Sequence, residues 1–406
     1  MKYTFLNKGV TAPLGFFAGG AHCGIRKNKA RRDLALIYSP VQCKAAAVYT
    51  QNKVKGAPIT QTRKNLQNGM AQAIIVNSGI ANTCNADGTE KARVMCGLAA
   101  EALGLNPADM IVASTGVIGE VLPIEPIADA MDGLAAALSV DGGTAAAEAI
   151  MTTDTHPKEL AVEFELNGKL CKIGGMAKGS GMIHPNMATM LVFLTTDVLI
   201  EIDALRCALK QTVDATFNMI SIDGDTSTND MVSIMASGLA GNAKIAMGTQ
   251  EYAVFAGALD ELCAALSKQI AKDGEGVTKL LECAVTGAVD LQSARAISKS
   301  VICSSLVKTA MFGADANWGR VLCAIGYADA EVDVAKVDVA FCSSAGCITV
   351  CQNGVGVDFR EEQAKKILSE NEIVIKIGLH DGDTQATAYG CDLTYDYVKI
   401  NGDYRT

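Results

Sequence analysis

The 406-residue sequence lacks the features that define several protein classes. It has no run of about 18 consecutive apolar residues, the length that a membrane helix requires. It also lacks a basic excess, because its formal net charge is −9 and its pI is near 5.1. Such a balance argues against nucleic acids and anionic membranes as partners. We therefore expect a cytoplasmic protein that binds neither nucleic acid nor membrane.

Histidines are scarce and closely paired cysteines are missing. The chain has four histidines, and none of its 14 cysteines belongs to a Cys-x-x-Cys pair. The closest pairs are Cys342 with Cys347 and Cys347 with Cys351. Scattered cysteines in a chain that is 49% hydrophobic are typical of reduced, mostly buried thiols. Since zinc-ligand spacing is missing, we expect no metal ion and no cofactor.

What the sequence does contain is an alternation of helix-like and strand-like segments along its whole length. This alternation is typical of an α/β or α+β protein with layered sheets flanked by helices. Asn167-Gly168 between two apolar runs predicts a hairpin within residues 161–173. Other strands are predicted at residues 71–78, 109–114, 189–197, 347–351 and 372–379. Helices are predicted at residues 90–104, 124–139, 145–152, 202–219, 251–272 and 359–370.

Residues 174–188, GGMAKGSGMIHPNMA, combine four glycines with a proline, which is typical of irregular backbone. They lead into the predicted buried strand that begins at Thr189. In one interpretation Thr189 is an ordinary β-branched strand residue. In a second, Gly179-Ser180-Gly181 with Lys178 forms a phosphate loop, although the P-loop spacing is not met.

A third interpretation is autocatalytic. If the Ala188–Thr189 bond lies in a strained turn, the Thr189 hydroxyl would attack the Ala188 carbonyl, and hydrolysis would free the Thr189 α-amine. An α-amine has a pKa of about 7.7–8.0, which suits a general base. An N-terminal threonine activated in this way is a nucleophile. Thr115-Gly116, after a predicted strand, would supply hydroxyl and N–H donors for an oxyanion hole.

Residues 178–191, KGSGMIHPNMATML, resemble the autoprocessing segment of the ornithine acetyltransferase family. Further segments resemble this family in order along nearly the whole chain, which favours the autocatalytic interpretation. These segments are residues 24–36, 76–84, 113–119, 150–158, 221–230, 313–320 and 386–406. One departure is Ile80, where the family pattern has asparagine.

The resemblance implies a layered sandwich like that of the aminopeptidases with an N-terminal nucleophile. It implies cleavage between Ala188 and Thr189 into an α chain, residues 1–188, and a β chain, residues 189–406, which assemble as an α2β2 heterotetramer. In the implied ping-pong reaction of arginine biosynthesis, Thr189 takes an acetyl group from N2-acetyl-L-ornithine and passes it to L-glutamate. Whether acetyl-CoA is a second donor, as in bifunctional members, stays open.

The resemblance also assigns roles to individual residues. It makes Thr115 and Gly116 the oxyanion hole beside the nucleophile Thr189. It places substrate contacts at Thr152, Lys178, Thr189, Glu275, Asn401 and Thr406. Lys178 suits a substrate carboxylate and Glu275 a cationic ornithine side chain, with a surface lysine and a loop glutamate as the alternatives.

Two rival functions remain, and two features of the sequence stand apart from the site. An N-terminal-threonine aminopeptidase or amidase would use the same nucleophile with water as acceptor, and a nucleotide-phosphate-binding protein would use residues 174–181. His184 is interpreted as structural, with assistance in cleavage as the alternative. A basic run is interpreted as a solvated surface segment rather than a polyanion site. It consists of Arg26, Lys27, Lys29, Arg31 and Arg32.

Overall fold

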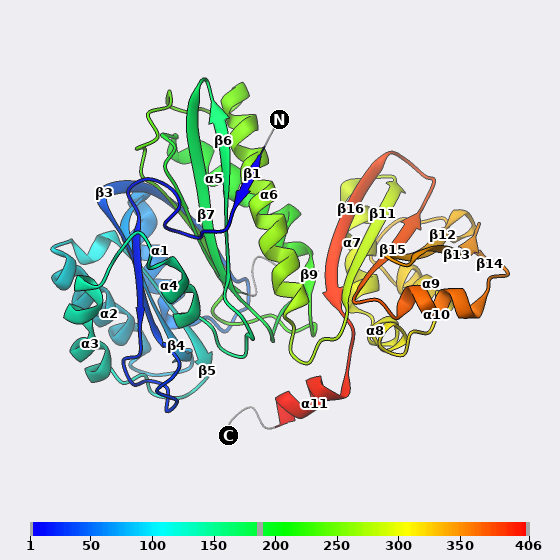
Figure 1. The fold of residues 1–406 in the computed structure, drawn as a ribbon, viewed down its shortest axis with the longest axis horizontal. Coiled ribbons are helices and arrows are strands. Elements are labelled where there is room, and N and C mark those ends of the chain that lie inside the picture. The colour runs from blue at the N-terminus through cyan, green and yellow to red at the C-terminus, as the bar shows by residue number, and fades with distance from the viewer. Residues whose placement is uncertain (1–2, 185–189, 403–406) are drawn as a thin grey trace. The chain divides into compact units, whose positions relative to one another are not determined.

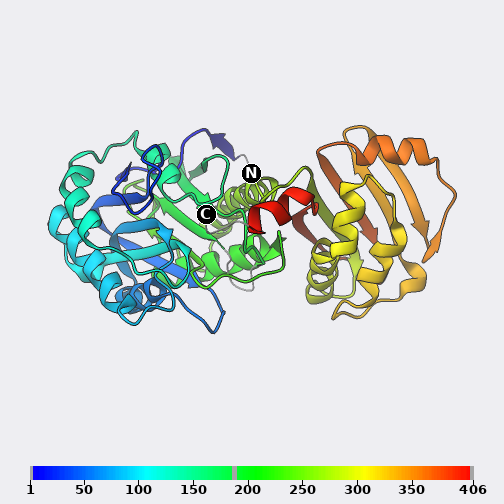
Figure 2. The ribbon, with the colours of Figure 1, turned by 90° about the horizontal axis from the view of Figure 1, so that it is seen from below.

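The computed structural model describes residues 3–184 and 190–402, which form two compact α/β units (Figure 1, Figure 2). The first unit comprises the described residues of 1–179, 185–218 and 226–266. The second comprises residues 180–184 and 219–225 and the described residues of 267–406. Each unit is built on one sheet with helices packed against it. None of the helices in the described residues is long and apolar enough to span a bilayer.

The first unit has a nine-stranded sheet. Its strands are β1 (Thr4–Leu6), β2 (Phe17–Ala21), β3 (Leu34–Tyr49), β4 (Met70–Ile80), β5 (Met110–Val117), β6 (Lys158–Leu166), β7 (Lys169–Lys178), β8 (Leu191–Thr196) and β10 (Met231–Ala236). Their order is β1-β6-β7-β8-β10-β3-β4-β5, and β2 pairs with β3. The sheet is mixed, because β8 is parallel to β10 and antiparallel to β7.

Both faces of the central strands of this sheet are buried. Leu34 and Leu36 of β3 belong to the apolar cluster that also contains side chains of α2 and α3. Ala35 and Ile37 point the other way, into the cluster that contains α4. This double burial explains the nearly continuous apolar runs of β3, β4 and β5. The helices of the unit are α1 (Ala57–Asn65), α2 (Gly88–Leu103), α3 (Glu125–Ala136), α4 (Gly143–Ala149), α5 (Ile202–Ala215) and α6 (Gln250–Lys272), the last of which continues past Leu266 into the second unit.

The second unit has a seven-stranded sheet in the order β14-β13-β12-β15-β11-β16-β9. These strands are β9 (Ile220–Ser221), β11 (Leu280–Ala288), β12 (Asp338–Ser343), β13 (Gly346–Gln352), β14 (Val355–Gly356), β15 (Glu372–Gly378) and β16 (Thr384–Cys391). The helices are α7 (Leu291–Cys303), α8 (Ser305–Phe312), α9 (Trp318–Gly326), α10 (Glu361–Leu368) and α11 (Tyr395–Gly402). Helices α7 to α10 cover one face, where Leu281, Cys283 and Val285 of β11 are buried.

Most predicted elements are confirmed, and their ends shift by a few residues. The hairpin at Asn167-Gly168 joins β6 to β7, and both residues have the positive φ that this two-residue turn requires (50° and 80°). The longest predicted helix, 251–272, is α6. Short 3₁₀ turns lie at Leu66–Asn68, Pro107–Asp109, Phe217–Met219 and Val334–Lys336.

The prediction of irregular backbone throughout residues 174–188 is wrong for its first five residues, which continue β7 to Lys178. The glycines there serve close packing. A Cβ on Gly174 would lie 2.2 Å from the carbonyl oxygen of Gly9, and one on Gly175 would lie 2.8 Å from Leu194 Cδ2. Glycine in this strand therefore marks a close approach of neighbouring groups.

The expectation that all cysteines are reduced is wrong for one pair. Cys342 and Cys347 face each other across the β12–β13 hairpin and form a disulfide bond. The hairpin turn itself brings the two positions together, an effect that the spacing alone does not reveal. Most of the remaining cysteines are free and buried, as predicted. The buried free cysteines are Cys43, Cys96, Cys171, Cys263, Cys283, Cys351 and Cys391.

Candidate active site

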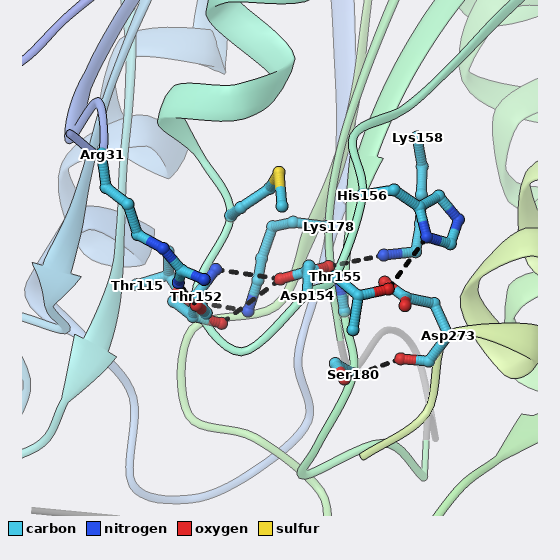
Figure 3. Close-up of polar contacts among 12 residues, drawn as sticks. Arg31, Thr115, Thr152, Asp154, Thr155, His156, Lys158, Lys178, Ser180 and Asp273 are labelled. Carbon is cyan, nitrogen blue, oxygen red and sulfur yellow. Dashed lines mark hydrogen bonds and ion pairs between the residues drawn. The ribbon is translucent and has the colours of Figure 1, made fainter. Parts of the chain in front are cut away.

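In the first unit, β5 and β7 bring two of the predicted site residues together. Lys178 is the last residue of β7, and its Nζ donates a hydrogen bond to Thr115 Oγ1 of β5 at 3.2 Å (Figure 3). Both side chains are buried. An ammonium group only donates, so the Thr115 oxygen accepts and its own proton remains available for another acceptor. This geometry suits an oxyanion-hole donor.

Gly116 follows Thr115 at the point where β4 and β5 come closest. Its φ is 132°, in the left-handed region that favours glycine. A Cβ at this position would lie only 2.2 Å from the carbonyl carbon of Gly79. Glycine is therefore required here by both backbone conformation and packing, in keeping with a backbone that must present its N–H group without a side chain.

Asp154 links Thr152 to the end of β7. Its Oδ2 accepts a hydrogen bond from the Thr152 backbone N–H at 2.9 Å. Its Oδ1 accepts from the Gly179 N–H at 2.8 Å and from Lys158 Nζ at 2.7 Å. Asp154 and Lys158 are almost completely buried. The carboxylate thus fixes the positions of Thr152 and Lys178 relative to each other, since Gly179 directly follows Lys178.

The charge of Asp154 follows from its neighbours. Burial alone would raise the pKa of this carboxyl group, but the ammonium groups of Lys158 and Lys178 and the hydrogen bonds from Lys158 and Thr152 hold its pKa well below the usual range. Asp154 is therefore ionised at neutral pH. Asp154 and Lys158 are not among the site residues predicted from the sequence. Their spacing of four residues within TTDTHPK was the available signal, but it resembles that of many surface pairs.

Asn229 supports the segment that carries Thr115. Its Nδ2 donates to the carbonyl oxygens of Ala81 at 2.5 Å and Ser114 at 2.9 Å. Its Oδ1 accepts a hydrogen bond from Thr83 Oγ1 at 2.5 Å. These buried bonds hold the ends of β4 and β5 together directly before Thr115. The run SIDGDTSTND thus contributes Asn229 to the support of the site.

In the second unit, two further predicted site residues contact each other. Asn401 Nδ2 of α11 donates to Glu275 Oε2 at 2.7 Å. Glu275 is buried, and its carboxylate lies where a Cβ on Gly181 would be, at 2.4 Å. Glycine at position 181 therefore leaves room for the carboxylate. A carboxylate this close would repel a bound phosphate, which argues against the phosphate-loop interpretation of Gly179-Ser180-Gly181.

The Asp223 turn of the second unit holds the segment that precedes residues 185–189. The Asp223 carboxylate accepts from the N–H groups of Met182 at 2.6 Å and Ile183 at 2.8 Å. His184 Nδ1 lies 3.1 Å from Ser221 Oγ and 3.4 Å from Cys303 Sγ. Burial and the charge of Lys299 lower the pKa of His184 from 6.5 to about 4. A neutral, partly buried imidazole with these contacts fits a structural role.

The remaining predicted site residues, Ala188, Thr189 and Thr406, lie outside the described residues, and their roles stay predictions. Strand β8 begins two residues after Thr189 in the sequence. Leu191 is the register partner of Lys178 in the β7–β8 pair. The predicted nucleophile is therefore only two residues along the chain from the strand position opposite Lys178.

Comparison with known proteins places the chain among relatives of similar length. It matches the ArgJ family over residues 17–406. A Symbiobacterium thermophilum protein named arginine biosynthesis bifunctional protein ArgJ is 53% identical, with 99% of this chain and 100% of that protein covered. A protein of the same name from Caldanaerobacter subterraneus subsp. tengcongensis is 49% identical, with 98% of each covered.

A solved structure is also similar. The crystal structure of the arginine biosynthesis bifunctional protein from Bacillus halodurans matches with 48% sequence identity and a TM-score of 0.50. The match covers 53% of this chain and 99% of that chain. The family match and the two relatives of similar length each extend over nearly all of the sequence. The chain therefore belongs to the ArgJ family, the acetyltransferases of arginine biosynthesis.

Proposed function

We propose that the protein transfers an acetyl group from N2-acetyl-L-ornithine to L-glutamate through an acetyl ester on Thr189. In this proposal the chain first cuts itself between Ala188 and Thr189, which frees the α-amine of Thr189. The resulting α and β chains, residues 1–188 and 189–406, form a cytoplasmic α2β2 heterotetramer. The relatives named as bifunctional ArgJ proteins of arginine biosynthesis support this reaction class.

The observation that carries the proposal is the position of Lys178 and Thr115. Lys178 lies opposite Leu191, two residues after the predicted nucleophile, and its ammonium group donates to Thr115 Oγ1. A buried cation and a hydroxyl donor close to the start of β8 provide the positive potential that a tetrahedral oxyanion requires. Asp154 holds this ammonium group and the Thr152 turn in fixed positions.

The chemical steps follow from these groups. As Thr189 Oγ attacks the acetyl carbonyl, its proton passes to the free α-amine of Thr189, and Thr115 and Gly116 stabilise the oxyanion. The amide C–N bond then breaks, and the proton goes to the departing amine of ornithine. In the second half-reaction the glutamate amine attacks the acetyl ester, a new C–N bond forms as the ester C–O bond to Thr189 breaks, and a proton of the amine passes to the Thr189 hydroxyl oxygen.

Two buried charges suit the two substrate ends. Both substrates carry an α-carboxylate, for which the Lys178 ammonium is a suitable partner. Glu275 is a buried acidic side chain that accepts a hydrogen bond from the neutral amide of Asn401, and an acidic side chain suits a cationic ornithine side chain. We therefore assign carboxylate recognition to Lys178 and recognition of the ornithine ammonium to Glu275.

The length of the similar crystallised chain also supports self-cleavage. Almost all of the Bacillus halodurans chain aligns with only 53% of this one, so it is about half as long. The proposed β chain would likewise make up just over half of the protein. If a precursor is cut into two polypeptides of similar size, each of them aligns with about half of the uncut chain.

A denaturing gel with N-terminal sequencing tests the cleavage. We expect two bands from the purified active protein, one of which begins Thr-Met-Leu-Val-Phe. The Thr189→Ala variant should remain one band and be inactive. A single band from protein that is fully active would rule out the mechanism.

Dependence on the acceptor tests the transferase reaction against an amidase or aminopeptidase reaction. We expect N2-acetyl-L-ornithine to be consumed rapidly only when L-glutamate is present, with equal amounts of N-acetylglutamate and ornithine formed. If the donor disappears equally fast without glutamate and no N-acetylglutamate forms, the acyl group goes to water and the transferase proposal fails. Size-exclusion chromatography with light scattering tests the α2β2 assembly.

A further inference from the structure

The second unit contains a pocket of about 170 Å³ where α7 ends and α8 begins. Its lining includes Cys303, Ser305 and Lys308 from this side, and Asp223, Gly224 and Tyr397 from the turn after β9 and from α11. A water molecule takes up about 30 Å³ of the liquid. The pocket therefore has room for the end of an amino-acid side chain.

Lys308 brings a positive charge without a counter-charge to this pocket. The residue is only 4% exposed. Its Nζ donates a hydrogen bond to the carbonyl oxygen of Cys391 and lies 3.4 Å from Sγ of the same residue. It forms no ion pair with any residue that the structure describes. A buried ammonium group without an anionic partner is unfavourable, so this one favours the binding of an anion.

The acidic residue in the lining, Asp223, already has its own partners. Its carboxylate accepts from the N–H groups of Met182 and Ile183, and also from that of Asp225 at 3.2 Å. Three N–H donors stabilise the charge of this carboxylate. The ammonium group of Lys308, in contrast, contacts only a neutral oxygen and a sulfur atom. The charge of the pocket that still lacks a partner is therefore positive.

Helix α11 connects this pocket to Glu275. The Asn401 amide that donates to Glu275 also donates to the carbonyl oxygen of Tyr397 at 3.1 Å. Tyr397 lines the pocket, and its burial and the charges of Asp223 and Glu275 raise the pKa of its phenol. The same phenol thus feels both carboxylates. Glu275 and the pocket that contains Lys308 are neighbours within the second unit.

The two amino acids of the proposed reaction have side chains of opposite charge. The side chain of acetylornithine ends in an ammonium group, and that of L-glutamate ends in a carboxylate. Both substrates react in turn at the same threonine, so both side chains occupy the same region. A carboxylate beside Glu275 would be repelled, since like charges in close contact are unfavourable. Glutamate therefore requires a second cation besides Lys178, which is assigned to the α-carboxylate.

We propose that Lys308 binds the γ-carboxylate of the acceptor L-glutamate in this pocket, and that it makes the enzyme select glutamate over uncharged amino acids. This inference rests on the proposed function, in which glutamate receives the acetyl group. The ornithine side chain is directed to Glu275 and the glutamate side chain to Lys308. One nucleophile can thus serve two substrates of opposite charge, because each charge has its own buried partner.

A comparison of L-glutamate with L-glutamine as acceptors tests this role, with acetylornithine as the donor. Glutamine has nearly the shape of glutamate but lacks its charge. In Lys308→Met, kcat/KM for glutamate should fall about 10- to 100-fold, the effect of losing a hydrogen bond between charged groups. The value for glutamine should change little, so the preference for glutamate should largely disappear.

Lys279→Met is the matched control for the loss of a buried lysine. Lys279 is also buried in the second unit, and its Nζ donates to the carbonyl oxygens of Met311 and Leu368. It does not belong to the lining of the pocket. This variant should lose stability but keep the preference for glutamate over glutamine, because a general loss of folded enzyme lowers both rates equally.

Ser305→Asp tests the pocket without removing a buried group. Ser305 is exposed and is the first residue of α8, where an acidic side chain stabilises the helix. The added carboxylate in the lining should repel the γ-carboxylate or compete for Lys308. We expect the KM for glutamate to rise about two- to fivefold, the size of an exposed charge effect. The KM for glutamine should stay unchanged.

Three results would overturn the inference. These are an unchanged preference for glutamate in Lys308→Met, an equal loss with both acceptors in that variant, and an unchanged KM for glutamate in Ser305→Asp. Exchange of label between ornithine and acetylornithine on the wild-type enzyme tests the proposed function separately, since it requires no glutamate. If the wild type catalyses neither exchange nor transfer, the proposed function fails. Calorimetry with glutarate on wild type and Lys308→Met then still decides whether Lys308 binds a carboxylate.

Discussion

At the scale of single residues, the site depends on charges that are buried together. Asp154 is surrounded by two lysines and by the N–H groups of two residues that flank the proposed reaction centre. Removing one member of a buried ion pair leaves the other unpaired in a medium of low polarity. Asp154, which has no substrate contact in the proposed reaction, therefore controls both the stability of the first unit and the geometry of its reactive groups.

The variant Asp154→Asn should lose stability and activity together. The Lys158 ammonium would stay buried without its counter-charge, which lowers the free energy of unfolding by about 3–5 kcal/mol. In the wild type, the N–H groups of Thr152 and Gly179 donate to different oxygens of Asp154. Asparagine has only one acceptor oxygen, so Thr152 and Gly179 would shift. A displacement of this kind lowers kcat by about 100-fold. Chemical denaturation and steady-state kinetics measure the two effects.

The double variant Asp154→Asn/Lys158→Met separates these two effects. Neither residue is then an unpaired buried charge, so most of the lost stability should return. Activity should stay low, since the Thr152 N–H group still lacks its carboxylate acceptor. An Asp154→Asn variant with normal kcat and normal stability would contradict the positioning role of Asp154.

Gly181→Ala tests the placement of Glu275. The added methyl group would occupy the space of the Glu275 carboxylate, which is the end of a movable side chain, so the backbone need not shift. We expect a KM for acetylornithine that rises about tenfold, the effect of losing roughly one charge-assisted hydrogen bond, while the midpoint of thermal unfolding changes little. An unchanged KM would show that Glu275 does not bind the ornithine end.

The residues of the site differ in how well the sequence predicts them. Lys178 and Thr115 lie in segments that resemble a known family, and the structure places them in contact. Asp154 and Lys158 are both buried, and no local pattern reports that burial. Side-chain burial of a charged pair is a tertiary property, so composition and spacing alone do not distinguish it from a surface pair.

At the scale of elements, β7 shows how glycine can serve packing within a regular strand. Gly-rich sequence usually indicates turns, because glycine tolerates unusual backbone angles. In β7 the backbone is regular, and the missing side chains admit the Gly9 backbone on one face and leucine side chains on the other. Local propensities predicted the hairpin and six of the helices correctly, whereas this packing requires knowledge of which segments cross.

Alanine substitutions at the two neighbouring glycines of β7 should differ in effect. At Gly175 the new methyl group meets the side chains of Leu194 and Leu266, which can adjust at about 1–3 kcal/mol. At Gly174 it meets the backbone oxygen of Gly9 at 2.2 Å, which cannot move alone. Gly174→Ala should therefore be the more destabilising variant in urea unfolding. Equal losses would contradict the packing argument.

At the scale of the whole molecule, the strand order of the first unit mixes the two proposed polypeptides. Strands β8 and β10 belong to the proposed β chain, and they lie between β7 and β3 of the proposed α chain. Hydrogen bonds along both borders join one polypeptide to the other. This order could not be read from the sequence, because pairing of strands far apart in the chain leaves no local signal.

The cut protein should therefore stay in one piece under native conditions. We expect the α and β chains to elute together from size exclusion and to separate only in denaturant, because separation would break two strand pairings in the middle of a sheet. The uncut Thr189→Ala variant provides the elution volume of the intact chain. Release of either polypeptide in native buffer would contradict this arrangement of strands.

The interleaved strands also make the first folding of the chain different from any later refolding of the two proposed polypeptides. While the chain is continuous, folding is unimolecular, and β8 finds its place because it is tethered to β7 by a short segment. After the proposed cut between residues 188 and 189, any return from the unfolded state becomes bimolecular, and its rate depends on concentration. The newly made chain thus folds in a fast unimolecular reaction before the cut. Enzyme that unfolds after the cut refolds slowly at low protein concentration, because its two polypeptides must first meet.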